Sequence, residues 1–215
     1  MKLNNYSNFK SNWSEAFKSK NFKAQFIITV LILCVLLPSL NYFFAFIEAR
    51  QGYQINDAIL NLAEPVDVSV YTFLIIYSAA VLTIILVLPQ PFLFLRAVQA
   101  YALMLLVRLL TLYFVPLNAP ENIIPLNDPF IEHFFYGQVR ITKDLFFSGH
   151  VATVFLLYLV NPIKKLNWFY LTVFILVAVF IMVQRVHYSF DVLAAPVFTW
   201  LCFKMVNMLP RSSNS

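Results

Sequence analysis

Long apolar runs separated by short polar stretches make up most of the chain. A run of about 17–25 apolar residues can cross a bilayer as a helix, because a helix rises 1.5 Å per residue and the hydrocarbon core is about 30 Å thick. The first run is too long for a cleaved signal peptide, and no small-residue cleavage site follows it. The pattern predicts an all-α polytopic membrane protein, a six-transmembrane-helix bundle, with spans at 24–47, 67–88, 92–115, 145–162, 166–184 and 187–208.

The composition agrees with this class. Hydrophobic residues make up 61% of the chain and charged residues 12%, whereas a soluble domain is about 45–50% apolar and about 25% charged. Mean hydropathy is +0.76. Cys34 and Cys202 both lie in apolar runs, which is typical of small core residues, so we expect neither a disulfide framework nor a metal site.

The distribution of Lys and Arg predicts the orientation. With a cytoplasmic N-terminus, ten of these residues lie on the cytoplasmic side, four on the opposite side, and Arg108 within a span. Both termini are therefore expected in the cytoplasm, and the loops at 48–66, 116–144 and 185–186 on the extracytoplasmic side. The net charge of +5 is mainly a topology signal and indicates no nucleic-acid partner.

The first 23 residues are polar and basic. Phe9, Trp13 and Phe17 recur every four residues. This spacing favours a short amphipathic helix on the inner membrane surface, with its lysines toward anionic lipid. A partly disordered tail is the alternative.

Four ionisable residues within the predicted spans are candidates for a functional site, because such groups are costly in lipid. Arg108 follows Arg96 by 12 residues, about 18 Å along a helix, and so lies in the outer half of the bilayer. His150 lies in the first turns of the fourth span, and His187 and Asp191 open the sixth. The topology, which rests on loop charges alone, brings all four to one depth near the outer face.

Their chemistry suits phosphoryl transfer. His187 and Asp191 are four residues apart and would share a helix face, where the carboxylate fixes the imidazole tautomer and leaves the other ring nitrogen basic. A helix start at Ser148-Gly149 offers unpaired N–H groups to a phosphate. Gly149 would let the phosphate approach closely, and the Ser148 hydroxyl can donate to it. Arg108 has the two-pronged geometry that fits phosphate oxygens.

Each residue also has an ordinary structural explanation. His150 could be a satisfied helix–helix contact, and Arg108 could balance a buried acid. His187 and Asp191 could be an ordinary i, i+4 pair. His133, in the long outer loop among aromatic residues, fits a rim residue better than a catalyst.

Two motifs carry a family resemblance. In DLFFSGH, Asp144 and the triplet 148–150 match C-G-D-x-x-x-S-G-H, with Thr142 and Lys143 in place of Cys-Gly, and HYSFDV matches H-Y-[ST]-x-D-V in full. These motifs resemble the sphingomyelin synthase family, the lipid phosphotransferase branch of the type-2 phosphatidic acid phosphatase superfamily. RAVQAYALMLLVRLLTLYFVPLNAP also resembles the family's third span. Ile181 stands where the broader superfamily has an Arg six residues before the nucleophilic His, which favours the synthase-like branch.

The resemblance implies a triad of His150, His187 and Asp191. His187 would attack phosphorus to form a phosphohistidine, and Asp191 would orient it. His150 would protonate the leaving group and then act as base toward the acceptor. No metal or other cofactor is expected. Together with the spacing argument, the resemblance gives the phosphate- or substrate-binding residues as Arg108, Asp144, Ser148, Gly149 and Tyr188.

We therefore predict an integral-membrane enzyme that moves a phosphorylated head group from a phospholipid to a lipid alcohol such as ceramide or diacylglycerol. Hydrolysis of a lipid phosphate or diphosphate is the alternative at the same site. A non-catalytic lipid-binding or transport protein is the alternative of another class, and the two imidazoles with an orienting carboxylate argue against it. We expect a cytoplasmic basic segment at 1–23, a membrane catalytic domain at 24–208 and a cytoplasmic tail at 209–215. The expected location is a bacterial inner or cell membrane, with the site facing the extracytoplasmic side.

The long outer loop bears on the choice between transfer and hydrolysis. Residues 115–135 contain four prolines, and Phe130, Ile131, Phe134 and Phe135 follow one another closely. These side chains could cover the site and exclude water, which would favour transfer. An ordinary interfacial loop is the alternative.

Overall fold

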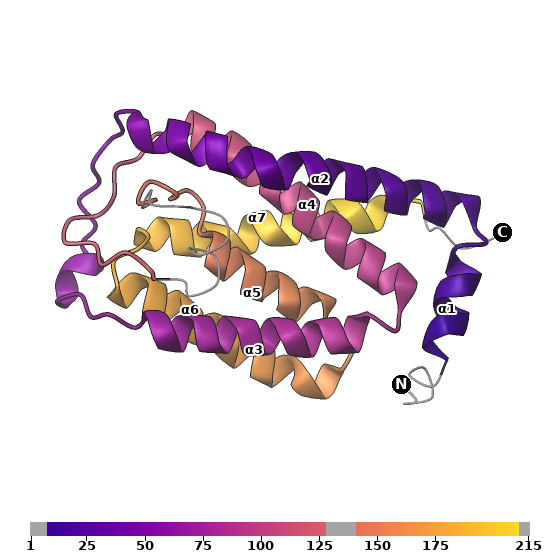
Figure 1. The fold of residues 1–215 in the computed structure, drawn as a ribbon. Helices are drawn as coiled ribbons and strands as arrows, with labels where there is room; N and C mark the ends of the chain where they lie inside the picture. The colour runs from indigo at the N-terminus through magenta and orange to yellow at the C-terminus, as the bar shows by residue number, and fades with distance from the viewer. Residues whose placement is uncertain (1–7, 128–140, 211–215) are drawn as a thin grey trace.

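The computed structural model describes residues 8–127 and 141–210. Six helices form the bundle that the apolar runs predict (Figure 1). Five of the described helices are long and apolar enough to cross a membrane, when the 3₁₀ turn Lys164–Leu166 is counted with the helix it precedes. The all-α polytopic membrane fold is thus confirmed. The bounds are α2 Lys20–Ala49, α3 Ser69–Val87, α4 Pro91–Phe114, α5 Gly149–Val160, α6 Asn167–Val183 and α7 Ser189–Met208.

Helix α5 is shorter than the fourth span predicted at 145–162. It has 12 residues, about 18 Å of helix, against a hydrocarbon core of about 30 Å. The residues before it are held by other contacts: the carbonyl of Phe147 accepts a hydrogen bond from Arg108 on α4 (2.9 Å), and Ser148 caps the helix. It ends before Pro162, which disfavours a helical conformation in the residue preceding it.

Helix α7 begins at Ser189, two residues later than predicted. Tyr188 is the N-cap residue in an extended conformation, and Asp191, in the first turn, accepts a hydrogen bond from its backbone N–H at 3.1 Å. A carboxylate in this position satisfies an N–H group that the helix leaves unpaired, and it interacts favourably with the helix dipole. His187 therefore lies just outside the helix.

The core of the bundle surrounds α5, which packs against α3, α4, α6 and α7. Val151, Ala152 and Val154 on α5 are fully buried, so this short helix contacts protein where the longer helices contact lipid. Helix α2 packs on α4, along one side of the bundle (Figure 1). The starts of α5 and α7 lie at one end, which we call the site end.

Helix α1, Phe9–Ala16, lies at the opposite end of the bundle (Figure 1). A helix in the first 23 residues was one of the two alternatives above. Its Trp13 packs edge-on against Phe22 and Phe94 and donates from Nε1 to the carbonyl of Leu88 at 2.9 Å. The aromatic stripe therefore docks α1 onto the start of α4, and contact with a membrane surface remains a prediction.

Candidate active site

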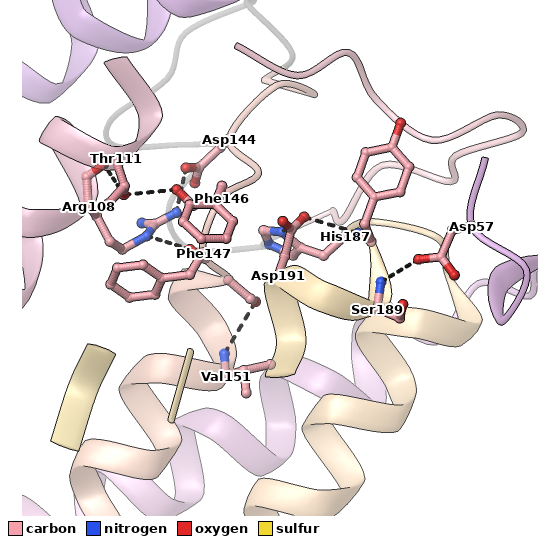
Figure 2. A network of polar contacts seen from close by, with 12 residues as sticks. Asp57, Arg108, Thr111, Asp144, Phe146, Phe147, Val151, His187, Ser189 and Asp191 are labelled. Atoms are coloured by element: carbon pink, nitrogen blue, oxygen red, sulfur yellow. Dashed lines mark hydrogen bonds and ion pairs between the residues drawn. The ribbon is translucent and has the colours of Figure 1, made fainter. Parts of the chain in front are cut away.

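Arg108 is the centre of a polar network at the site end (Figure 2). It is 7% exposed, and its Nε donates to the carbonyl of Phe147 at 2.9 Å. Its Nη2 pairs with Oδ1 of Asp144 at 2.5 Å. Thr111, one turn later on α4, donates to the carbonyl of Phe146 at 3.0 Å. These contacts fix the guanidinium plane, as a group that binds phosphate oxygens requires.

The position of the Arg108 guanidinium leaves no room for a side chain at Gly149. A Cβ atom at position 149 would lie 2.5 Å from Nη1 and 2.7 Å from Cζ of Arg108, well inside van der Waals contact. From the sequence, we expected this glycine to allow the close approach of a phosphate. In the structure, the guanidinium itself occupies the space that the missing side chain leaves, and it lies over the first turn of α5.

Ser148 is the N-cap of α5, and its Oγ accepts from the N–H of Val151 at 3.5 Å. Its own N–H donates to the carbonyl of Asp191 at 3.2 Å, so the starts of α5 and α7 are joined directly. Ser148 is fully buried. Its observed contacts are therefore those of a cap, and the predicted donation to phosphate has no counterpart among them.

His187 and Asp191 meet as the spacing predicted, although not on one helix face. Nδ1 of His187 lies 3.5 Å from Oδ2 of Asp191, beside the start of α7 (Figure 2). The capping position of Asp191 points its carboxylate back toward the residue before Tyr188, and this brings the pair together. Both side chains are buried, at 2% and 0% exposure. The separation exceeds a normal hydrogen bond, and such contacts at catalytic sites tighten when substrate binds.

A cavity of about 380 Å³ opens beside this network, between α2, α3, α4 and α5. We call it the chamber. Its polar end contains Arg108, Asp144, Gly149 and His150. The rest is mainly apolar and extends along the helices away from the site end, lined by Leu37, Leu40, Phe44, Phe73, Ile76, Met104, Leu105 and Leu109, among others.

The chamber gathers some of the predicted site residues and leaves others behind its wall. Arg108 and His150 line it, and the ring of His150 packs edge-on against Phe73 with 5.8 Å between ring centroids. Ser148, His187 and Asp191, which the sequence analysis assigned to the same site, do not line it. The hydrogen bond from Ser148 to Asp191, which joins the starts of α5 and α7, connects them to the site.

The remaining predicted residues lie in different places. Tyr188 is buried, donates from its hydroxyl to the carbonyl of Asn118 at 2.9 Å, and lines a second cavity. Arg96 lies far from the site, where it donates to the carbonyl of Val206 at 2.6 Å near the end of α7. His133 and the aromatic residues of the proposed cover, 130 to 135, lie outside the described residues.

Two acidic residues that the sequence argument missed hold the site in place. Glu48, at the end of α2, accepts from the backbone N–H groups of Thr142 and Lys143 at 2.9 and 3.0 Å. Asp57 accepts from the N–H of Ser189, the first residue of α7, at 2.6 Å. Burial acts to raise the pKa of Asp57, but its hydrogen bonds outweigh burial, and the pKa lies below its ordinary value. Neither residue belongs to a motif; Glu48 directly follows a predicted span, whereas Asp57 lies in the middle of a predicted loop.

No group of three His, Cys, Asp or Glu side chains suited to a metal ion occurs within 8–127 and 141–210. The chemistry that the described residues offer is that of two imidazoles, a carboxylate and an arginine fork. Such a set can bind a phosphate, form a bond from nitrogen to phosphorus and transfer a proton to the leaving oxygen.

Comparison with known proteins agrees with this chemistry. Residues 143–208 match the family model of the PAP2 superfamily C-terminal region. The match contains Asp144, both histidines and Asp191, whereas Arg108 precedes it. No curated protein matched the chain. The match supports the resemblance to the type-2 phosphatidic acid phosphatase superfamily and, with it, phosphatase- or phosphotransferase-type chemistry on lipid phosphates.

Proposed function

We propose that the protein is a lipid phosphotransferase of the sphingomyelin synthase-like kind, which moves a phosphorylated head group from a phospholipid to a lipid alcohol. The observation that carries the proposal is the chamber, whose polar end is formed by Arg108 and His150 and whose remainder is apolar. Leu37, on its α2 wall, is 38% exposed, so the cavity reaches the surface that faces lipid. A donor or acceptor with hydrocarbon tails fits such a space, and water is a poor occupant of it.

In the proposed reaction the two histidines take the roles that the family resemblance implies. Nδ1 of His187 faces Asp191, so Nε2 is the nitrogen that attacks phosphorus. The bond from phosphorus to the diacylglycerol oxygen breaks, and His150 protonates that oxygen. His150 then removes the proton of the acceptor hydroxyl, whose oxygen attacks phosphorus and releases His187. The products are diacylglycerol and a new phospholipid.

The charge at the polar end favours a phosphodiester donor. Among the described residues that line the chamber, Arg108 and the protonated His150 each carry a positive charge, and Asp144 pairs with Arg108 at 2.5 Å, so one net positive charge remains. A phosphomonoester dianion would meet a guanidinium that is already neutralised, together with a carboxylate that repels it. A phosphodiester carries one negative charge and suffers less repulsion. This observation favours head-group transfer over hydrolysis of a lipid phosphate, which remains the second candidate.

Mass spectrometry of labelled lipids tests the proposal. Purified protein is incubated with a labelled phospholipid donor, with and without a lipid alcohol. We expect a new phospholipid only when the alcohol is present. We also expect label on the enzyme that acid releases, as from a phosphohistidine. His187→Ala, as control, should give neither. Rapid release of free phosphate from lipid phosphates, with no lipid product from any alcohol, would identify a phosphatase instead.

A further inference from the structure

The chamber contains two hydroxyl groups beyond its polar end, and no step of the proposed reaction uses them. They belong to Tyr101 and Thr153, which both line the chamber. Thr153 follows His150 on α5 by three residues, and Tyr101 precedes Arg108 on α4 by seven, so each shares a helix face with a residue of the polar end. At 1.5 Å per residue, the two positions lie about 4.5 and about 10.5 Å farther from the site end.

The Thr153 hydroxyl lacks a hydrogen bond that several threonines in these helices make. A threonine in a helix can donate to the carbonyl four residues earlier, which satisfies the hydroxyl where lipid offers no partner. Thr29, Thr83 and Thr199 make this bond at 2.7, 2.8 and 2.7 Å. The corresponding carbonyl for Thr153 is that of Gly149, yet the Thr153 hydroxyl makes no hydrogen bond among the described residues.

The Tyr101 hydroxyl is in the same situation. Two buried tyrosines are paired: the hydroxyl of Tyr170 bonds to that of Thr83 at 2.8 Å, and Tyr188 donates to a backbone carbonyl at 2.9 Å. Tyr101 has no such partner in the part of the chain that the structure describes. Within the same part, neither its oxygen nor that of Thr153 is one of the fully enclosed polar atoms without a partner, so both oxygens are open to the chamber.

Two unpaired hydroxyls in a mainly apolar cavity limit the chemistry of the molecule that fills it. Each can donate a hydrogen bond, and a donor without a partner away from water costs free energy. In the proposed reaction, a lipid has its reacting oxygen beside Arg108 and His150, so the groups that follow this oxygen lie at the depth of the two hydroxyls. In an acylated lipid those groups include carbonyl oxygens, which accept hydrogen bonds. An ether-linked lipid or a plain fatty alcohol has no carbonyl there.

We propose that Tyr101 and Thr153 determine which lipid alcohols are accepted. Their hydroxyls donate to the acyl carbonyls of the acceptor and so select ester- or amide-linked alcohols over ether-linked lipids and fatty alcohols. This inference rests on the proposed transfer function and names the residues that set its acceptor specificity.

Binding of short-chain lipids without a donor tests the inference in the absence of turnover. Dioctanoylglycerol and dioctylglycerol have the same free hydroxyl and the same chain length, and they differ in the ester carbonyls. Their dissociation constants are measured on the full-length protein in detergent, by displacement of a fluorescent diacylglycerol. We expect the ester to bind roughly tenfold or more tightly, the effect of two hydrogen bonds. N-octanoylsphingosine, measured in the same way, tests an amide carbonyl.

Tyr101→Phe and Thr153→Val remove the hydroxyls and keep the size of each side chain. Each variant should reduce the ratio of the ether and ester dissociation constants, and the double variant should lose most of the preference. Partition of the lipids into micelles is the same for every variant, so a change in the ratio reports the protein alone. Tyr158→Phe and Thr172→Val are the matched controls, because neither side chain lines the chamber. They should leave the ratio unchanged.

The carbonyl lipid that loses more affinity in the double variant identifies an ester or an amide as the preferred linkage. If the double variant changes neither the ratio nor the affinity for N-octanoylsphingosine, the inference is overturned. A protein that shows the preference but forms no lipid product with any acceptor would refute the proposed transfer and leave carbonyl recognition standing. A protein that transfers head groups without any such change in binding would refute the inference alone.

Discussion

Replacement of Gly149 by alanine is the most direct test of the contact on which the site is built. The new Cβ would lie 2.5 Å from Nη1 of Arg108, and ordinary contact begins at 3.4 Å. The guanidinium must therefore move by roughly 0.9 Å. It cannot do so freely, because Nε bonds to Phe147 and Nη2 to Asp144. Any movement that relieves the clash weakens those bonds and misdirects the fork.

The effect on activity should exceed the effect on stability. A displacement of about 1 Å at a positioning group can cost about 100-fold in rate, and we expect kcat/KM to fall by that factor. Overpacking costs about 1–3 kcal/mol, whereas alanine in a helix is about 0.5–1 kcal/mol better than glycine. The net loss is between about 0 and about 2.5 kcal/mol, which lowers the thermal midpoint by at most roughly 10 °C in a chain of this size.

The assay is lipid transfer followed by mass spectrometry, with thermal unfolding measured on the same preparation. Arg108→Lys provides the control, because lysine lacks the guanidinium plane that the new methyl group strikes. It should impair transfer strongly by itself, and Gly149→Ala added to it should cost little more, since the two residues share one contact. Full activity in Gly149→Ala, or purely additive losses in the double variant, would show that this contact does not position the arginine.

Three other outcomes are expected. Asp191→Asn should lower the transfer rate by about 10⁴-fold, as when the carboxylate of a Ser-His-Asp triad is replaced; a rate within tenfold of wild type would remove Asp191 from the mechanism. Met104→Trp should fill part of the chamber and raise the KM for long-chain acceptors more than for short-chain ones; an equal effect on both would place the tails elsewhere. The pKa of Asp57 in the folded protein lies below the ordinary 3.8, so its stabilising contribution is present above that value and is lost as pH falls through the folded pKa. Thermal unfolding between pH 6 and pH 3 should therefore show a larger loss of stability in wild type than in Asp57→Asn, and identical pH profiles would contradict this role.

The sequence by itself determined the class of fold and most of the helices. Hydropathy is a local property, and a run long enough to span lipid must be helical because lipid offers no partner to its backbone groups. The prediction was wrong at the start of α5, where the apolar run beginning at 145 is helical only from Gly149. There a carbonyl outside the helix bonds to Arg108, thirty-nine positions away, and no local pattern records such a partner.

The candidate residues were also visible in the sequence, because an ionisable group in an apolar run is costly and therefore conspicuous. Their partners were not. The pairing of His187 with Asp191 was predicted from spacing, yet it arises from a cap and not from a shared helix face. Only the tertiary structure decided that Gly149 accommodates Arg108, that Asp144 neutralises it, and that the hydroxyls of Tyr101 and Thr153 are open to one chamber. Each of these depends on the packing of segments distant in the chain, whose positions are set by the whole bundle.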